Sequence, residues 1–306
     1  MKYLLSLIFS LNVIFYIFLI YKPLNTESEF LIEEGNNLSE IFTNLEEKKI
    51  HFPKTIKLIF NVSGIDKKIH LGNYKIDNSD SLIDIFKKIY FGQIILKKFI
   101  ISEGSKLTDL FSEEIIKSYC QTMNLQNECE LEGYVKPDVY FYNRENELLS
   151  ILKKSIERQK IDLSKSWRAR DSKLKNFSKK EILIIASILE KESCANEREK
   201  ISGVIYNRLL NNMLLQMDST TIYGLKDFNG NLKKKDLRDS SLYNTYMHKG
   251  LPPGPISNPS KNSIFAAAQP EEHDYLYFVA KDKCSHEFST NYDDHLKAVK
   301  KYQLRK

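Results

Sequence analysis

The sequence has few cysteines, and none is spaced as a metal-ligand pair or as a redox pair. The four are Cys120, Cys129, Cys194 and Cys284. The separation of Cys120 and Cys129 fits neither a zinc knuckle nor a CxxC motif. These two could pair in an extracytoplasmic compartment, although nothing in the sequence requires a disulfide. The sequence therefore predicts no metal site built on cysteine.

A strong charge of either sign is also lacking. The chain has 46 basic and 40 acidic residues, and the resulting net charge of +6 favours an anionic partner only weakly. Its hydrophobic content of 42% and charged content of 28% are those of a globular protein rather than a disordered one. A chain of 306 residues suffices for one large domain or two smaller ones.

The first residues lack both formal charge and a cleavage site. An uncharged run extends from Tyr3 to Tyr21, between Lys2 and Lys22, and its end, "YIFLIYKPLN", contains no A-x-A pattern. A helix of this length can cross a bilayer. We therefore expect a single-pass transmembrane signal anchor over residues 1–22, with the rest of the chain outside the plasma membrane. Nucleic acid is then disfavoured as a partner.

Two further domains of α+β class are expected after this anchor. Residues 23–97 read as a small α/β subdomain, with a turn at Gly35, a helix from Leu38 and a later helix capped by Ser79. Residues 98–306 read as a larger mixed α+β domain. Its opening, "IISEGSKLTDLFSEEI", resembles the earlier "FLIEEGNNLSEIFTNL" and suggests a repeated supersecondary unit.

One helix in the larger domain is apolar up to its last turn. Ser178 and Glu181 form a capping-box pattern, which predicts a helix from residue 179 to about 193 over "EILIIASILEKES". At helical spacing Glu192 falls within the apolar stripe, whereas Glu190 falls away from its centre. Burial should raise the pKa of Glu192 and keep it protonated, as a general acid requires. The alternative is an ordinary helix terminus reaching solvent.

Polar and aromatic segments follow this helix. The loop "LQMDSTTIYGL" contains Gln216, Asp218 and Tyr223, and "YNTYMHKGLPPGPISNP" contains Asn244 and Tyr246. Four of the eight prolines stand together in the second segment, and proline makes a loop rigid. Such side chains are typical of a sugar-binding cleft, which predicts that these segments line a site. An ordered surface loop is the alternative.

An ordered set of motifs resembles a known family. "LEGYVKPDVY", "ASILEKES", "YNRL", "LQMDSTTIYGL", "YNTYMHKGLPPGPISNP", "AAAQP", "DYLYFVA" and "HEFS…DDH" occur in the order seen in the endolytic murein transglycosylases (MltG, YceG-like). Two departures are Ser219, where the family usually has proline, and Val139, where it usually has threonine. The predicted anchor and the unit at 30–97, which looks like the family's LysM-like subdomain, extend the resemblance to nearly the whole chain.

The resemblance implies a lytic transglycosylase, a carbon–oxygen lyase that cleaves the MurNAc-β-1,4-GlcNAc bond and forms a 1,6-anhydro end. Glu192 is then the catalytic residue, without a metal or cofactor. Candidate sugar contacts are Gln216, Asp218, Tyr223, Asn244 and Tyr246. The resemblance also implies nascent peptidoglycan strands as the substrate and glycan-polymerising synthases as possible partners.

Two other functions remain open from the sequence. The chain could be a peptidoglycan hydrolase that uses Glu192 together with Asp218, or a non-catalytic peptidoglycan-binding scaffold. Histidine-based metal chemistry is weaker, because His273, His286 and His295 form no pair on one helix face. They are interpreted as structural or loop residues.

Overall fold

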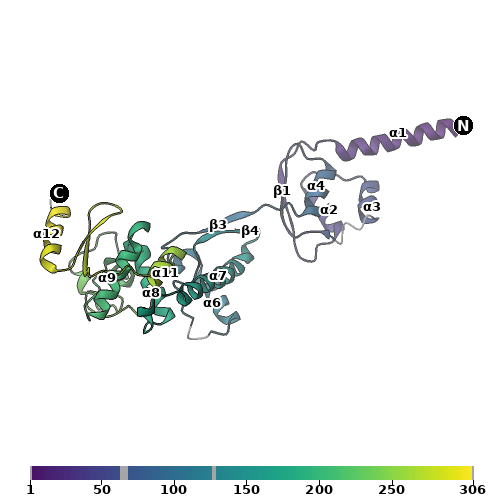
Figure 1. The fold of residues 1–306 in the computed structure, drawn as a ribbon. Helices are drawn as coiled ribbons and strands as arrows, with labels where there is room; N and C mark the ends of the chain where they lie inside the picture. Colours follow the sequence, from purple (N-terminus) through teal and green to yellow (C-terminus); the bar gives the residue numbers. More distant parts are fainter. Residues whose placement is uncertain (1, 63–67, 126–128, 305–306) are drawn as a thin grey trace. The chain divides into compact units, whose positions relative to one another are not determined.

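The computed structural model describes residues 2–62, 68–125 and 129–304, which form two compact units (Figure 1). The N-terminal unit comprises residues 1–98 and 141–147, and the C-terminal unit comprises residues 99–140 and 148–306. The mixed α+β class is confirmed, with many helices and small two-stranded sheets among the described residues. The sequence did not indicate that residues 141–147 return to the N-terminal unit.

The first helix, α1, covers Lys2–Tyr21 and coincides with the uncharged run. Within the described ranges, however, no helix combines the length and the apolar character needed to cross a membrane. The predicted transmembrane span is therefore not confirmed.

Among its described residues, the N-terminal unit also contains a two-stranded antiparallel sheet and the helices that pack on it. These elements are β1 (Ser28–Ile32), α2 (Leu38–Glu47), α3 (Lys54–Val62), β2 (Gly72–Ile76) and α4 (Leu82–Phe91). Phe30 lies opposite Tyr74 in the sheet, and both belong to the buried core. Helix α4 is capped by Ser81 rather than by Ser79, because Ser81 stands three residues before Asp84 and completes a capping box. The LysM-like character of this unit stays a prediction.

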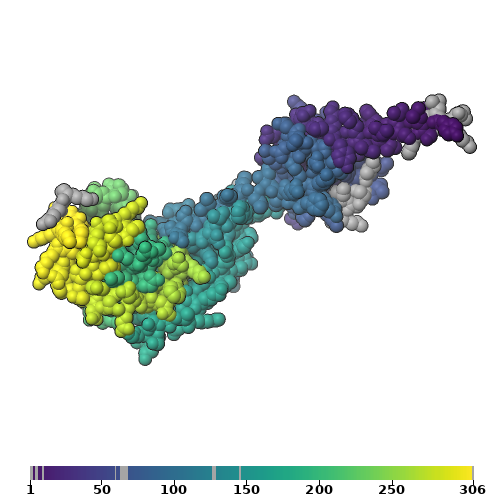
Figure 2. All heavy atoms as spheres, turned by 45° about the horizontal axis from the view of Figure 1, so that its top comes forward, coloured from purple at the N-terminus to yellow at the C-terminus, as the bar shows by residue number. Residues whose placement is uncertain are grey.

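The C-terminal unit is mainly helical. Its elements are β3 (Lys97–Ile101), α5 (Leu107–Leu110), α6 (Glu113–Thr122), β4 (Asp138–Tyr142), α7 (Leu148–Arg168), α8 (Lys179–Glu192), α9 (Arg198–Leu210), α10 (Asp218–Gly224), α11 (Lys261–Ala268), β5 (Tyr277–Ala280), β6 (His286–Ser289) and α12 (Tyr292–Tyr302). Strands β3 and β4 pair where the chain passes between the units, and β5 and β6 form an antiparallel hairpin. In Figure 2 the yellow C-terminal residues form one continuous surface with green segments of this unit.

Helix α8 occupies the centre of the C-terminal unit. It contacts α7, α9, α10 and α11, and every residue from Ile182 to Leu189 is buried. Burying each large aliphatic side chain of this run stabilises the fold by about 1.5–3 kcal/mol before entropic costs. The middle of the helix is therefore enclosed on all sides, and its two ends reach the edge of the core.

The proline-rich segment lies behind α8 and not in the cleft described below. The backbone N–H of Ile256 donates to Ser187 Oγ at 3.0 Å, and the Ser257 hydroxyl donates to the Ser187 carbonyl at 3.0 Å. Pro255 also packs closely on Gly133, which has φ +80°. A Cβ at this position would stand 2.6 Å from Pro255 Cβ, so that no larger residue fits there. The prediction that this segment lines the site holds for Tyr246 but not for its proline-rich part, whose buried polar groups are used to hold α8.

Glu190 is more deeply buried than its position on the helical wheel indicated. Its side chain is 4% exposed and pairs with Arg198, which is 9% exposed, at 2.8 Å. It also accepts hydrogen bonds from the backbone N–H and the hydroxyl of Ser260, at 2.7 and 2.6 Å. Glu190 thus joins α8 to α9 and to the start of α11.

We predict that Glu190→Gln destabilises the C-terminal unit. The change leaves the buried Arg198 guanidinium without a charged partner, which costs about 3 kcal/mol. Urea unfolding of the variant and of Glu114→Gln, a matched change at an exposed position of α6, measures the difference. Equal stability of the two variants would contradict this role for Glu190.

Candidate active site

The chain leaves the core at the C-terminal end of α8. Ser178 caps the helix and forms the predicted capping box with Glu181, and Glu192 is the last helical residue. Ser193 is already extended, with φ −134° and ψ 146°, and its hydroxyl donates to the Leu189 carbonyl at 2.7 Å. The predicted helix is confirmed, and its end places the Glu192 side chain at the edge of the core.

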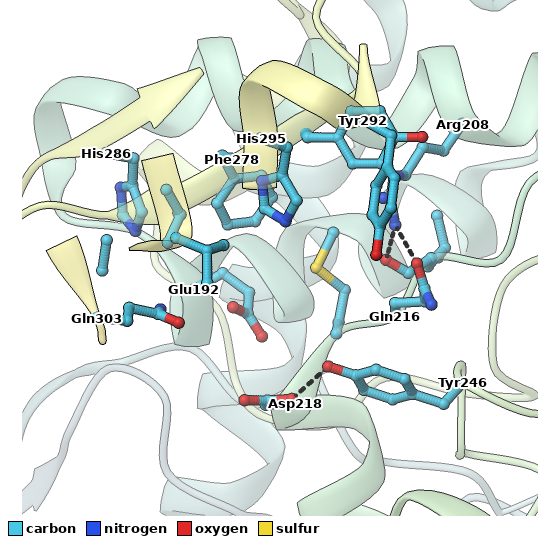
Figure 3. A pocket seen from close by; sticks show the side chains of 16 residues that line it. Glu192, Arg208, Gln216, Asp218, Tyr246, Phe278, His286, Tyr292, His295 and Gln303 are labelled. Carbon is cyan, nitrogen blue, oxygen red and sulfur yellow. Dashed lines mark hydrogen bonds between the residues drawn. The ribbon is translucent and has the colours of Figure 1, made fainter. Parts of the chain in front are cut away.

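Glu192 lines a cleft of about 460 Å³ (Figure 3). The walls come from the ends of α8 and α9, from the segment leading into α10, and from β5, β6 and α12. The lining residues are Glu192, Arg208, Leu215, Gln216, Met217, Asp218, Tyr246, Tyr277, Phe278, Val279, Ala280, His286, Tyr292, His295, Val299 and Gln303. Parts of the C-terminal unit that are distant in sequence therefore meet around a single carboxyl group.

Glu192 is held by a residue of α10. The hydroxyl of Ser219 donates to Glu192 Oε1 at 2.5 Å, and the backbone N–H of Ser219 donates to the same oxygen at 3.2 Å. Burial raises the pKa of the Glu192 carboxyl, and these two hydrogen bonds lower it in part. The nearby charge of Asp218 raises the pKa again and His286 lowers it, with a net upward shift. The site can therefore supply a proton nearer to neutral pH than an exposed glutamate can.

A second carboxylate stands in the same cleft. Tyr246 donates its hydroxyl to Asp218 Oδ1 at 2.6 Å, and Figure 3 shows this pair beside Glu192. Burial, followed by the hydrogen bond to Asp218, raises the pKa of the Tyr246 hydroxyl, so that it remains a donor. Asp218 is accordingly oriented by Tyr246 while its charge faces the cleft.

Gln216 has an unusual backbone conformation at the cleft. Its φ is +54°, in the left-handed region that residues with a side chain rarely adopt. Arg208 stabilises this turn by donating to the carbonyls of Leu214 and Leu215 at 3.0 and 2.7 Å, and to the Gln216 side chain at 3.3 Å. Strain of this kind is concentrated at functional sites.

Comparison with known proteins identifies the family. The model of the YceG-like family matches residues 30–301. The chain belongs to the YceG-like family. The crystal structure of a yceG-like protein from Listeria monocytogenes is similar to it, with a TM-score of 0.59 and 29% identity, and the match covers 89% of this chain and 98% of that one.

Curated relatives carry the name endolytic murein transglycosylase. The one from Bacillus subtilis (strain 168) is 37% identical over 173 residues, which are 56% of this chain and 48% of the relative. The one from Streptococcus pneumoniae (strain D39) is 27% identical over 300 residues, 81% of this chain and 53% of the relative. The chain thus spans about half the length of the curated relatives it matches.

Four of the six site residues predicted from the sequence of this YceG-like chain meet in the cleft, namely Glu192, Gln216, Asp218 and Tyr246. Tyr223 does not line it, since its hydroxyl donates to Glu132 at 3.3 Å and its ring packs against Tyr243.

Asn244 is also outside the cleft lining. It is fully buried and binds Thr221 and the backbone carbonyls of Leu237 and Asp239. Tyr223 and Asn244 therefore lie outside the lining of the cleft around Glu192, and their role as sugar contacts stays a prediction.

The wall formed by β5, β6 and α12 was not predicted from the sequence. Tyr277 stacks on His295 with ring centroids 5.1 Å apart, and Tyr292 lies 5.9 Å from Tyr277. Burial and the positive charge of Arg208 lower the pKa of His295. The motifs "YNRL", "DYLYFVA" and "HEFS…DDH" contain these residues, but only tertiary structure brings them to Glu192. His286 and His295, interpreted from the sequence as structural or loop residues, lie in β6 and α12 and line the cleft.

Two links fasten this wall to the end of α8. Cys194 and Cys284 form a disulfide across a sequence separation of 90 residues. His286 Nδ1 lies 2.7 Å from Glu197 Oε2, just after α8. The second disulfide, Cys120–Cys129, spans only 9 residues beside α6. The Cys194–Cys284 bond therefore stabilises the cleft wall itself.

We predict that Glu192→Gln stabilises the chain at neutral pH. The pKa of Glu192 in the folded state lies above its ordinary value of 4.5, so the folded chain binds more protons and loses stability as pH rises through that range. Glutamine does not ionise, so the variant does not lose stability in this way as the pH rises. Unfolding at pH 4 and pH 7.5 should show a gain for Glu192→Gln only at the higher pH.

Glu114→Gln is the matched control for this measurement, since it removes an exposed carboxylate and should show no such pH-dependent gain. A gain for Glu192→Gln of the same size at both pH values would show that ionisation of Glu192 does not affect folding.

We predict that removing Cys194–Cys284 loosens the hairpin of β5 and β6. A bond closing a loop of this length contributes about 4 kcal/mol in the chain-entropy model. In the double variant Cys194→Ser, Cys284→Ser, amides of β5 and β6 should exchange hydrogen faster. The double variant Cys120→Ser, Cys129→Ser should leave them protected, and equal exchange in both would refute the link.

Proposed function

We propose that this chain is a peptidoglycan lytic transglycosylase with Glu192 as its catalytic acid and base. The observation that carries the proposal is a single carboxyl group with a raised pKa, fixed by Ser219, at the wall of a cleft. The name of the curated relatives supports peptidoglycan as the substrate. We further propose that the MurNAc-β-1,4-GlcNAc bonds cleaved lie within nascent strands.

One carboxyl group serves both steps of this reaction. Protonated Glu192 donates to the glycosidic oxygen as the bond from C1 breaks and positive charge develops on the sugar ring. The resulting carboxylate then removes the proton of the C6 hydroxyl on the same MurNAc. That oxygen attacks C1 and closes the 1,6-anhydro ring. The proton returns to Glu192, and no water is consumed.

The other cleft residues suit the charges of this path. Asp218 presents a negative charge to the cleft, which stabilises a developing oxocarbenium ion. Gln216 and Tyr246 place an amide and a hydroxyl beside it. Tyr277, Tyr292 and His295 offer ring faces on the opposite wall. A polar wall and an aromatic wall can thus hold a glycan strand between them, next to Glu192.

A hydrolase is the second candidate, because Asp218 lines the same cleft as Glu192. Asp218 would then act as nucleophile or as base for a water, and the distance between the carboxyl groups would set the stereochemistry. Products distinguish the two reactions, since a hydrolase leaves reducing ends and a transglycosylase leaves anhydro ends.

We also propose that the cleft works outside the cytoplasm. The disulfides Cys120–Cys129 and Cys194–Cys284 support this location, because disulfides persist in oxidising compartments. Attachment to the plasma membrane and association with glycan-polymerising synthases stay predictions.

The test is cleavage of intact peptidoglycan by the full chain, with mass spectrometry of the released fragments. We expect termini lighter by one water, absent with Glu192→Gln and present with the control Glu114→Gln. Asp218→Asn should reduce the rate without changing the product. Reducing termini lost with Asp218→Asn would establish the hydrolase instead. Absence of any product from the native chain would favour the non-catalytic binding protein.

A further inference from the structure

One residue of the cleft controls one oxygen of Glu192. Both donors that reach Glu192 Oε1 belong to Ser219, the hydroxyl at 2.5 Å and the backbone N–H at 3.2 Å. Within the described residues, Oε2 has no hydrogen-bond partner and no lysine or arginine forms an ion pair with Glu192. The two oxygens of this carboxyl group are therefore in different environments.

The position of the proton follows from this geometry. A backbone N–H can only donate, so the oxygen that it faces is the unprotonated one. In the neutral carboxyl group Oε1 is accordingly the carbonyl oxygen, and the proton is on Oε2. We propose that Ser219 is a positioning residue for Glu192, which holds Oε1 and thereby leaves the proton on Oε2 for the glycosidic oxygen. This inference rests on the proposed function.

The effect of Ser219 on the pKa of Glu192 opposes that of burial and of Asp218, and has the same direction as that of His286. Burial and the charge of Asp218 on α10 favour the neutral carboxyl group, whereas His286 on β6 favours the carboxylate. His286 is itself paired with Glu197 at 2.7 Å.

Further charged or titratable groups line the same cleft: Arg208 of α9, Tyr246 of the loop between α10 and α11, Tyr277 of β5, and Tyr292 and His295 of α12. None of them donates a hydrogen bond to Glu192 among the described residues. Ser219 is the residue that stabilises the carboxylate by direct contact, and this makes Glu192 a stronger acid than burial alone would allow.

Three substitutions separate the two donors. Ser219→Ala removes the hydroxyl and keeps the N–H. Ser219→Pro removes both, at a position in the first turn of α10 where proline breaks no helical hydrogen bond. Ser219→Thr keeps both. The control Ser193→Ala makes the same change beside Glu192, at a hydroxyl that binds the Leu189 carbonyl instead of the carboxyl group.

The first measurement is the pH dependence of kcat/KM on peptidoglycan. In Ser219→Ala the alkaline limb should move up by about one to two pH units, because a hydrogen bond to a charged acceptor has that effect on ionisation. Ser219→Pro should move it at least as far, and Ser219→Thr should restore the native profile. At the optimum, Ser219→Ala should lower kcat and leave KM unchanged. An unmoved alkaline limb in Ser219→Ala and Ser219→Pro would overturn the proposal.

The second measurement requires no catalysis. The carboxyl group of Glu192 is titrated by infrared difference spectroscopy, with Glu192→Gln as the reference. Its midpoint should rise in Ser219→Ala and stay unchanged in Ser193→Ala. A shifted midpoint in a chain that releases no product would support the role of Ser219 while refuting the transglycosylase. Equal midpoints in the native chain and Ser219→Ala would refute the role of Ser219 whether or not the chain is active.

Discussion

Enclosure of α8 by the other helices of the C-terminal unit is the constraint on which the site depends. A helix whose middle, Ile182 to Leu189, is fully buried can present polar groups only near its ends. The capping box of Ser178 and Glu181 satisfies the first end, and the chain turns extended at Ser193 to finish the second. Glu192 is therefore brought to the boundary between core and cleft by the packing of residues that take no part in chemistry.

Glu190 and Glu192 illustrate how partners decide the role of a buried carboxyl group. Glu190 meets the Arg198 guanidinium and two donors of Ser260, so its charge is compensated and it joins three helices. Glu192 meets donors from Ser219 but no paired cation in the described part of the chain, and burial dominates its ionisation. Although they are two residues apart in sequence, Glu190 supports the fold as one member of a buried ion pair, and Glu192 has a raised pKa in a cleft.

The hairpin of β5 and β6 and helix α12 complete the cleft. They contribute less to the core around α8 than the helices that pack on it. Their aromatic rings and histidines form a wall that the Cys194–Cys284 bond and the Glu197–His286 pair fasten to the end of α8. Because the wall is attached next to Glu192, its distance from that carboxyl group is maintained. The match of the YceG-like family model includes this wall as well as α8.

The sequence by itself determined the mixed α+β class, the bounds and cap of α8, and the orientation of Glu192 toward the apolar side, because these follow from local periodicity and capping. Its motifs also indicated the family. Tertiary structure alone decided that Gln216, Asp218 and Tyr246 join Glu192 while Tyr223 and Asn244 are used in loop folding. It also decided that Ile256 and Ser257 of the proline-rich segment bind α8, that Ser219 reaches Oε1, and that Cys194 pairs with Cys284. These outcomes depend on contacts between segments far apart in the chain, and no spacing within a single helix or loop encodes them.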